Sequence, residues 1–109
     1  MDIGFKDRDM RRLCEDEKLA IKKLGKLVAK KLRGRLNDLQ AAANLNELPA
    51  GNPHPLKREF EGCIGITLEG GYRLVIRPAN NPLPLRPGGD LDRQRVTIVT
   101  IEYIGDYHD

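Results

Sequence analysis

The sequence predicts an α+β protein in which an N-terminal helical hairpin packs on a small, mainly antiparallel sheet of four to five strands. Two patterns predict this class. Apolar residues recur every three or four positions between residues 15 and 38, as on one face of a helix. From residue 63 onward they alternate with polar residues or form β-branched runs, as strands do. Helices followed by a run of strands are typical of α+β proteins.

The first forty residues contain the predicted helices. Asp2-Ile3-Gly4-Phe5 alternates and predicts a short strand, and Asp7 is placed to cap a short helix that runs through Cys14. A longer helix is predicted from about Glu15 to Asp38, although Gly25 and Gly34 each weaken it by about 1 kcal/mol relative to Ala. Its apolar stripe consists of Ile21, Leu24, Val28, Leu32 and Leu36 or Leu39.

The remaining residues predict the sheet. Residues 40–48 suggest one more helical turn, and the proline-rich segment 49–55 is a loop by composition. Strands are then predicted at 56–60 (the weakest pattern), 63–69 and 72–77, with Glu69-Gly70-Gly71 as a tight hairpin turn between the last two. A long Pro/Gly loop follows at 79–95, and residues 96–104 are apolar on both faces, as in a central strand. At 109 residues, we expect a single domain spanning 1–109.

Charge is distributed unevenly. The net charge is +3, but residues 1–36 carry 12 Lys and Arg against 6 Asp and Glu, while residues 37–109 carry 7 against 10. Lys22, Lys26 and Lys30 share one helical face, which we assign as an RNA-binding surface; a solvated face is the alternative. The chain has two cysteines, no signal-peptide pattern and no run of about 18 apolar residues, so we expect a cytoplasmic protein with no membrane partner.

Polar residues from three separated segments are candidates for one site. Arg73 and Arg77 share a strand face, and the last strand leads to a Tyr-His pair. RNA cleavage without a metal needs a base for the ribose 2′-hydroxyl, an acid for the leaving oxygen, and cations that offset phosphoryl charge. The predicted catalytic residues are His54, Lys57, Arg73, Tyr107 and His108, with Arg77 as a further RNA contact. We expect no metal site and no small-molecule cofactor, because the cysteines and histidines have no ligand spacing.

Two motifs give the chain a family resemblance. The ending Asp106-Tyr107-His108 and the strand Tyr72-Arg73-Leu74-Val75-Ile76, after a Lys/Leu-rich helical hairpin, resemble the HigB branch of the RelE/ParE toxin superfamily. The resemblance implies a type II toxin, a ribosome-dependent messenger-RNA endoribonuclease neutralised by a cognate helix-turn-helix antitoxin. It also implies that Arg73 faces the scissile phosphate. The loop at 79–95, the terminal Asp109 and the Pro-rich surroundings of His54 depart from the family pattern.

Other interpretations remain open. Arg73 could pair with Glu69 or Glu102, Tyr107 and Tyr103 could be packed aromatics, and the histidines could be surface residues. The superfamily also contains ParE-type gyrase inhibitors, so a non-catalytic interaction protein or an inactive antitoxin-binding partner is the alternative function. A plain RNA-binding module is disfavoured, because the chain has only five aromatic residues.

Overall fold

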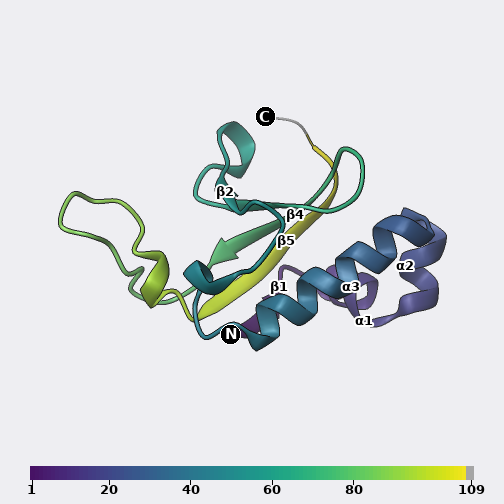
Figure 1. Cartoon of the computed structure of the whole chain (residues 1–109), viewed down its shortest axis with the longest axis horizontal. Helices are drawn as coiled ribbons and strands as arrows, with labels where there is room; N and C mark the ends of the chain where they lie inside the picture. The colour runs from purple at the N-terminus through teal and green to yellow at the C-terminus, as the bar shows by residue number, and fades with distance from the viewer. Residues whose placement is uncertain (108–109) are drawn as a thin grey trace.

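The structure, a computed structural model, describes residues 1–107 and has the predicted α+β architecture. Three helices lie against one face of a five-stranded sheet with the strand order β1-β5-β4-β3-β2 (Figure 1). β1 runs parallel to β5, and the other neighbours are antiparallel. The strands are β1 (Asp2–Phe5), β2 (His54–Pro55), β3 (Ile64–Thr67), β4 (Tyr72–Pro78) and β5 (Ile98–Asp106).

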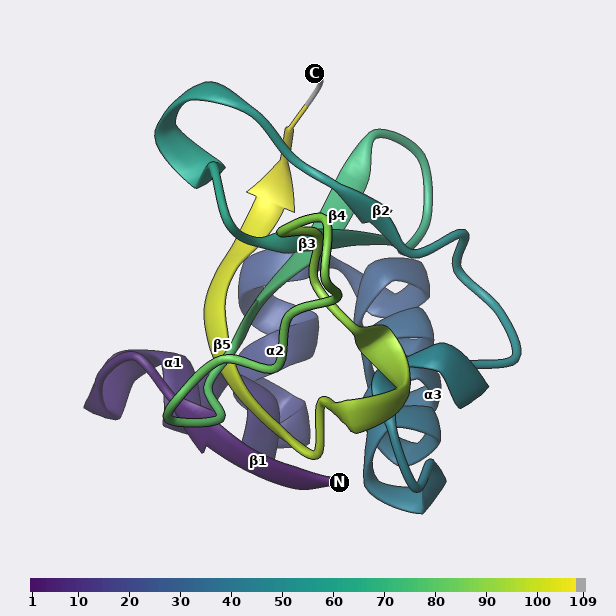
Figure 2. The ribbon, with the colours of Figure 1, turned by 90° about the vertical axis from the view of Figure 1, so that its left-hand side faces the viewer.

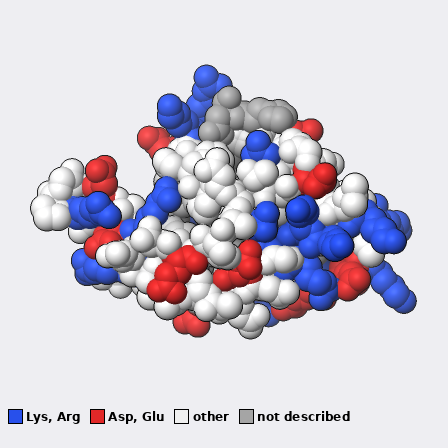
Figure 3. Space-filling model, viewed as in Figure 1, with Lys and Arg blue, Asp and Glu red and all other residues white. Residues whose placement is uncertain are grey.

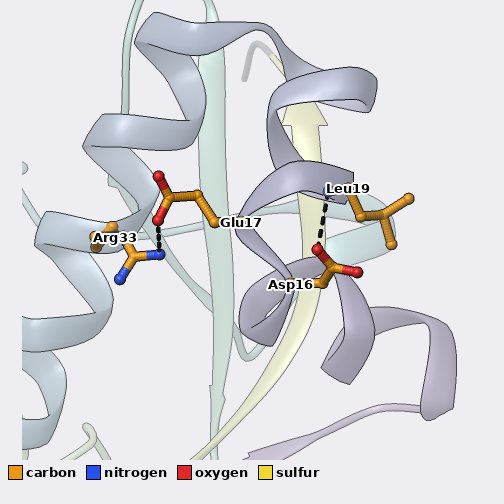
Figure 4. A network of polar contacts seen from close by, with 4 residues as sticks. All are labelled: Asp16, Glu17, Leu19 and Arg33. Atoms are coloured by element: carbon orange, nitrogen blue, oxygen red, sulfur yellow. Dashed lines mark hydrogen bonds and ion pairs between the residues drawn. The ribbon is translucent and has the colours of Figure 1, made fainter.

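Aspartate side chains define the starts of the first two helices. In α1 (Arg8–Glu15), the Asp7 carboxylate accepts from the Met10 amide at 2.8 Å, as predicted. The next aspartate, Asp16, ends α1 and caps α2 (Glu17–Leu24) by accepting from the Leu19 amide at 3.1 Å (Figure 4). Two short helices therefore form where local capping is available.

The single helix predicted over 15–38 is wrong. Gly25, with φ of 87° and ψ of 160°, separates α2 from α3 (Lys26–Ala41). This backbone conformation is almost restricted to glycine, because any Cβ would be strained there. The Gly25 amide closes α2 on the Ile21 carbonyl, and the Gly25 carbonyl accepts from Ala29 in α3. The structure therefore has three helices, and Ile21 of the predicted stripe remains 39% exposed.

The helices bury the inner face of the sheet, which we define as the face bearing Leu74 and Ile76. Both side chains are fully buried, as the predicted alternation requires. α3 contributes Val28, Leu32 and Leu39 to the same core. Figure 2 shows the helices stacked on this one side. Consequently, the opposite, outer face must be covered by other segments or be open to solvent.

A short segment covers part of the outer face. The strand predicted at 56–60 is wrong: β2 is only His54–Pro55, and Arg58–Phe60 forms a 3₁₀ turn with Arg58 at φ of 58°. Leu56 then packs with Cys63 and Val75, and Phe60 lies at the margin of this small cluster. The apolar pattern at 56–60 thus comes from packing over the sheet and not from pairing within it.

The last strand begins and ends two residues later than predicted, and a β-bulge interrupts it. Ile76 pairs with Ile101 whereas Val75 pairs with Tyr103, so Glu102 is the extra residue. The bulge reverses the alternation, which turns Ile104 inward and Tyr103 outward. The prediction that this strand is buried on both faces is therefore only partly right, since Tyr103 and Ile98 are 37% and 38% exposed.

The loop predicted at 49–55 is wrong at its end, because His54–Pro55 pair with β3 as β2, but the other predicted irregular segments are confirmed. One extra turn is present at Leu45–Glu47, within the predicted 40–48. Residues 79–95 form a long surface loop that includes a 3₁₀ turn at Arg93–Arg95. The loop joins the end of β4 to the start of β5 and projects from the body (Figure 1). Because Tyr72 pairs with Asp106 at the other end of this hairpin, the loop lies at the end away from Tyr107.

Candidate functional site

Three segments that carry predicted catalytic residues meet on the outer face of the sheet. The Tyr107 hydroxyl donates to the Lys57 carbonyl at 3.3 Å, and the Tyr107 amide donates to the Gly71 carbonyl at 3.2 Å. Arg73 pairs in register with Gly105, two residues before Tyr107. The end of β5, the hairpin turn and the segment after β2 are therefore held together at one place.

Arg73 is half-buried on the outer face, beside this junction. Its Nη1 donates to the carbonyls of Tyr72 (3.1 Å) and Gly70 (3.4 Å), which hold the guanidinium near the hairpin turn. Within residues 1–107, no carboxylate pairs with Arg73, so the predicted alternative pairings with Glu69 and Glu102 are absent there. A guanidinium with further donors at Nε and Nη2 can grip a phosphate in a bidentate manner.

His54 belongs to the same face, in the row of paired residues two positions along β4 from Arg73. It pairs with Gly65, which pairs with Val75, and its Nδ1 lies 2.8 Å from the Asn52 carbonyl oxygen. Gly65 permits this arrangement: a Cβ there would lie 2.9 Å from Leu56 Cδ2 and 3.3 Å from His54 Cε1. The imidazole and the Leu56 side chain therefore both lie directly over the β3 backbone.

Arg77 has a different environment. Its Nε donates to the Glu102 carboxylate at 2.9 Å, and this hydrogen bond raises the pKa of the Arg77 guanidinium. Cys63 lies nearby, and burial raises the pKa of its thiol, with Arg77 opposing the shift. Arg77, predicted as an RNA contact, is thus engaged in an ion pair at the far end of β4 from Tyr72.

The predicted RNA-binding lysines lie in the other layer. Lys22 is on α2, whereas Lys26 and Lys30 are on α3, and all three are exposed. Figure 3 shows Lys and Arg side chains gathered over the α2–α3 corner seen at the right of Figure 1. An ion pair between Arg33 and Glu17 ties the two helices together (Figure 4). The structure therefore does not bring these lysines next to Arg73, which is on the opposite face of the sheet.

Sequence reasoning missed two aromatic members of the site. Phe60 lies 5.2 Å from the Tyr103 ring and 5.0 Å from the Tyr107 ring, centroid to centroid. A pocket of about 460 Å³ opens beside them, lined by Arg58, Glu59, Phe60, Tyr103, Asp106 and Tyr107. The sequence pattern places Phe60 in a strand and allows Tyr103 to be packed. The bulge at Glu102 that turns Tyr103 outward has no signal in the alternation pattern.

The other predictions concern residues outside this cluster. His108 lies outside the described residues. A second cavity, of about 490 Å³, lies between β1 and the helices and is lined by residues such as Phe5, Cys14 and Leu32. Among residues 1–107, no three His, Cys, Asp or Glu side chains are grouped as metal ligands. No helix in this part of the chain combines the length and apolar character needed to cross a bilayer.

No protein-family model matches the chain, and a search of curated proteins also finds no match. The resemblance to the HigB branch therefore depends on the sequence motifs and on a fold of the predicted class.

Proposed function

We propose that this protein is a type II toxin of the HigB kind, a ribosome-dependent messenger-RNA endoribonuclease. The observation that supports this most is the junction on the outer face. There, Arg73 sits beside a hydrogen bond that joins the Tyr107 segment to the Lys57 segment. The Arg73 guanidinium is half-buried, has no carboxylate partner among residues 1–107 and lies near the basic Lys57 segment. These properties favour a phosphate-binding role over a purely structural one.

The proposed reaction is an internal phosphoryl transfer. A general base removes the proton from a ribose 2′-hydroxyl, and the 2′-oxygen forms a bond to the adjacent phosphorus. The bond from phosphorus to the 5′-oxygen breaks as a general acid gives that oxygen a proton. The products are a 2′,3′-cyclic phosphate and a free 5′-hydroxyl, so no water is consumed in this step. Negative charge on the non-bridging oxygens increases along the way, and fixed cations stabilise it.

Each predicted residue has a role in this scheme. Arg73 and Lys57 hold the phosphate and offset its growing charge. His54 and His108 are the candidates for proton transfer, because a histidine side chain can act as a general acid or base. Tyr107 acts by position: its hydroxyl donates to the Lys57 carbonyl, so it keeps the His54–Lys57 segment against the end of β5.

The proposal includes partners and place of action. The substrate is messenger RNA on the ribosome, the neutralising partner is a helix-turn-helix antitoxin, and the site of action is the cytoplasm. The lysines on α2 and α3 lie on the opposite layer from Arg73, so they suit contacts to ribosomal RNA, whose phosphates extend well beyond the scissile one.

The first prediction concerns Arg73. Induced in growing cells, the wild-type chain should arrest growth and leave new 5′ ends within translated transcripts, mapped by end sequencing. Arg73→Ala should lower cleavage at least about 100-fold, as loss of one charge-stabilising donor commonly does. The matched control is Arg86→Ala, which removes an exposed arginine of the 79–95 loop. This variant should cleave messenger RNA as the wild type does.

Two results would contradict the nuclease proposal, and a third would contradict the role of Arg73. Arrest with intact messages would favour the gyrase-directed alternative. No arrest at all would favour an inactive antitoxin-binding partner. Cleavage that persists in Arg73→Ala, with the variant folded by circular dichroism, would remove Arg73 from the site while leaving the nuclease assignment in place.

A further inference from the structure

Three of the five aromatic residues in the chain gather at one place on the outer face. Phe60 contacts both tyrosines, and its ring plane is tilted by 33° from that of Tyr103 and by 51° from that of Tyr107. They come from two segments, the 3₁₀ turn after β2 and the end of β5. Figure 2 shows this turn (teal) close to the end of β5 (yellow).

This cluster differs from an ordinary core. The main core is on the inner face, and the buried cluster on the outer face consists of Leu56, Cys63 and Val75, with Phe60 packed against it. Tyr103 keeps 37% of its surface exposed. The pocket of about 460 Å³ beside the rings falls within the size range of small-ligand sites. Rings that remain accessible next to a pocket can stack on a ligand.

Gly105 lies between Arg73 and the three rings of Phe60, Tyr103 and Tyr107, which we call the aromatic platform. A Cβ on Gly105 would lie 2.3 Å from the Tyr103 hydroxyl oxygen and 2.6 Å from its Cζ, so only glycine lets this ring lie across the strand. Gly105 is also the residue that pairs with Arg73. The Tyr103 ring and Arg73 are therefore carried by neighbouring positions of the β4–β5 pair, and Arg58 also lines the pocket.

We propose that Phe60, Tyr103 and Tyr107 form a stacking site for an unpaired nucleobase, next to the nucleotide whose phosphate Arg73 holds. The inference builds on the proposed function and adds how the RNA is held. Every base presents a π face, so such a platform binds single strands with little sequence preference. Bases within a duplex are already stacked and paired, so the site selects for single-stranded RNA. Phe60, which is not among the predicted catalytic residues, is then the central RNA-binding ring.

The test measures binding apart from cleavage. A short fluorescein-labelled 2′-O-methyl oligoribonucleotide keeps the bases and phosphates but lacks the attacking hydroxyl, so it is not cut. Phe60→Leu should weaken its binding, measured by anisotropy, by about 5- to 150-fold, the range for loss of one stacked base. Phe5→Leu makes the same chemical change at a ring on β1 and should bind as the wild type does.

A second variant covers the case in which Phe60→Leu fails to fold. The chain has no tryptophan, so Phe60→Trp places a single reporter in the platform and retains an aromatic ring. Its emission should be quenched by the single strand and not by the same sequence in a duplex. Equal affinity of Phe60→Leu and wild type, or equal quenching by both forms, would overturn the stacking site. If the single strand alone quenches but no message is cut in cells, the platform stands and the nuclease proposal fails.

Discussion

Arg73 and Arg77 lie on the same face of β4, four residues apart, yet their guanidinium groups have different partners. The Arg77 guanidinium forms an ion pair with the Glu102 carboxylate. Glu102 is the extra residue of the β-bulge, so it has no paired residue on β4. Arg73 lies beyond the bulge, opposite Gly105, and its Nη1 turns to backbone carbonyls. One inserted residue in β5 thus separates a structural arginine from the arginine proposed to bind phosphate.

The Cys14 thiol leads to a prediction about stability at alkaline pH. Burial, with a smaller effect of Glu15, raises the pKa of the Cys14 thiol from 9.0 to about 12. Between these values the unfolded chain loses the Cys14 proton while the folded chain keeps it, so the folded state binds more protons. The free energy of unfolding must therefore fall as the pH rises from 9 towards 12.

Urea titrations from pH 8 to 11 measure this effect. The denaturation midpoint of the wild type should fall more steeply with pH than that of Cys14→Ala, because titration of other groups is common to both proteins. Below pH 8 the difference between the two midpoints should not vary with pH. Parallel curves over the whole range would show that the Cys14 thiol titrates alike in the folded and unfolded chains.

At the scale of elements, the break at Gly25 shapes the helical layer. An uninterrupted helix over 15–38 would carry Ile21 and Val28 on one straight stripe. Instead α2 folds back on α3, where the Glu17–Arg33 ion pair joins them. Gly34, the second glycine of the same segment, lies inside α3 with no positive φ and no atom within 4 Å of an added Cβ. The two glycines therefore have opposite roles, although the sequence presents them alike.

The same substitution at these two glycines should change stability in opposite directions. Gly25→Ala places a Cβ at φ of 87° and should lower the free energy of unfolding by about 1–3 kcal/mol. Gly34→Ala should raise it by about 0.5–1 kcal/mol, since alanine restricts the unfolded chain and suits a helix. Chemical denaturation of the two variants beside the wild type checks both signs. A neutral or stabilising Gly25→Ala would mean that α2 and α3 can join without a glycine.

On the scale of the whole molecule, the sheet separates two basic surfaces. Lys22, Lys26 and Lys30 lie on the helical layer, and Arg73 lies on the outer face with the aromatic platform. A single phosphate cannot contact both, because the core of the protein lies between them. Under the proposed function, the two surfaces act in different steps, the lysines in association with the ribosome and Arg73 in cleavage.

Replacing the three lysines should separate these steps. The triple variant Lys22→Gln, Lys26→Gln, Lys30→Gln should bind purified ribosomes more weakly, with a shallower salt dependence, because fewer phosphate contacts release fewer counterions. Cleavage at saturating protein should match the wild type. Binding is measured by co-sedimentation with ribosomes at several salt concentrations. The control for loss of charge is the double variant Arg86→Gln, Arg95→Gln, which changes two exposed arginines of the 79–95 loop. If the triple variant cleaves messenger RNA more slowly than the wild type at saturating protein, the lysines take part in the cleavage reaction itself.

The sequence by itself determined the fold class, the β1 strand, the Asp7 cap and the inward side chains of β4, because each depends on local periodicity or capping. It also selected Arg73, Lys57 and Tyr107 as candidates, and the structure brings their segments to one junction. Tertiary structure alone decided the break at Gly25, the packing of residues 56–60 over the sheet, and the bulge at Glu102 that turns Tyr103 outward. The packing of residues 56–60 and the bulge depend on contacts between residues distant in the chain, and alternation within one strand carries no record of an inserted residue. At Gly25, the apolar periodicity continues through a backbone conformation that it does not reveal.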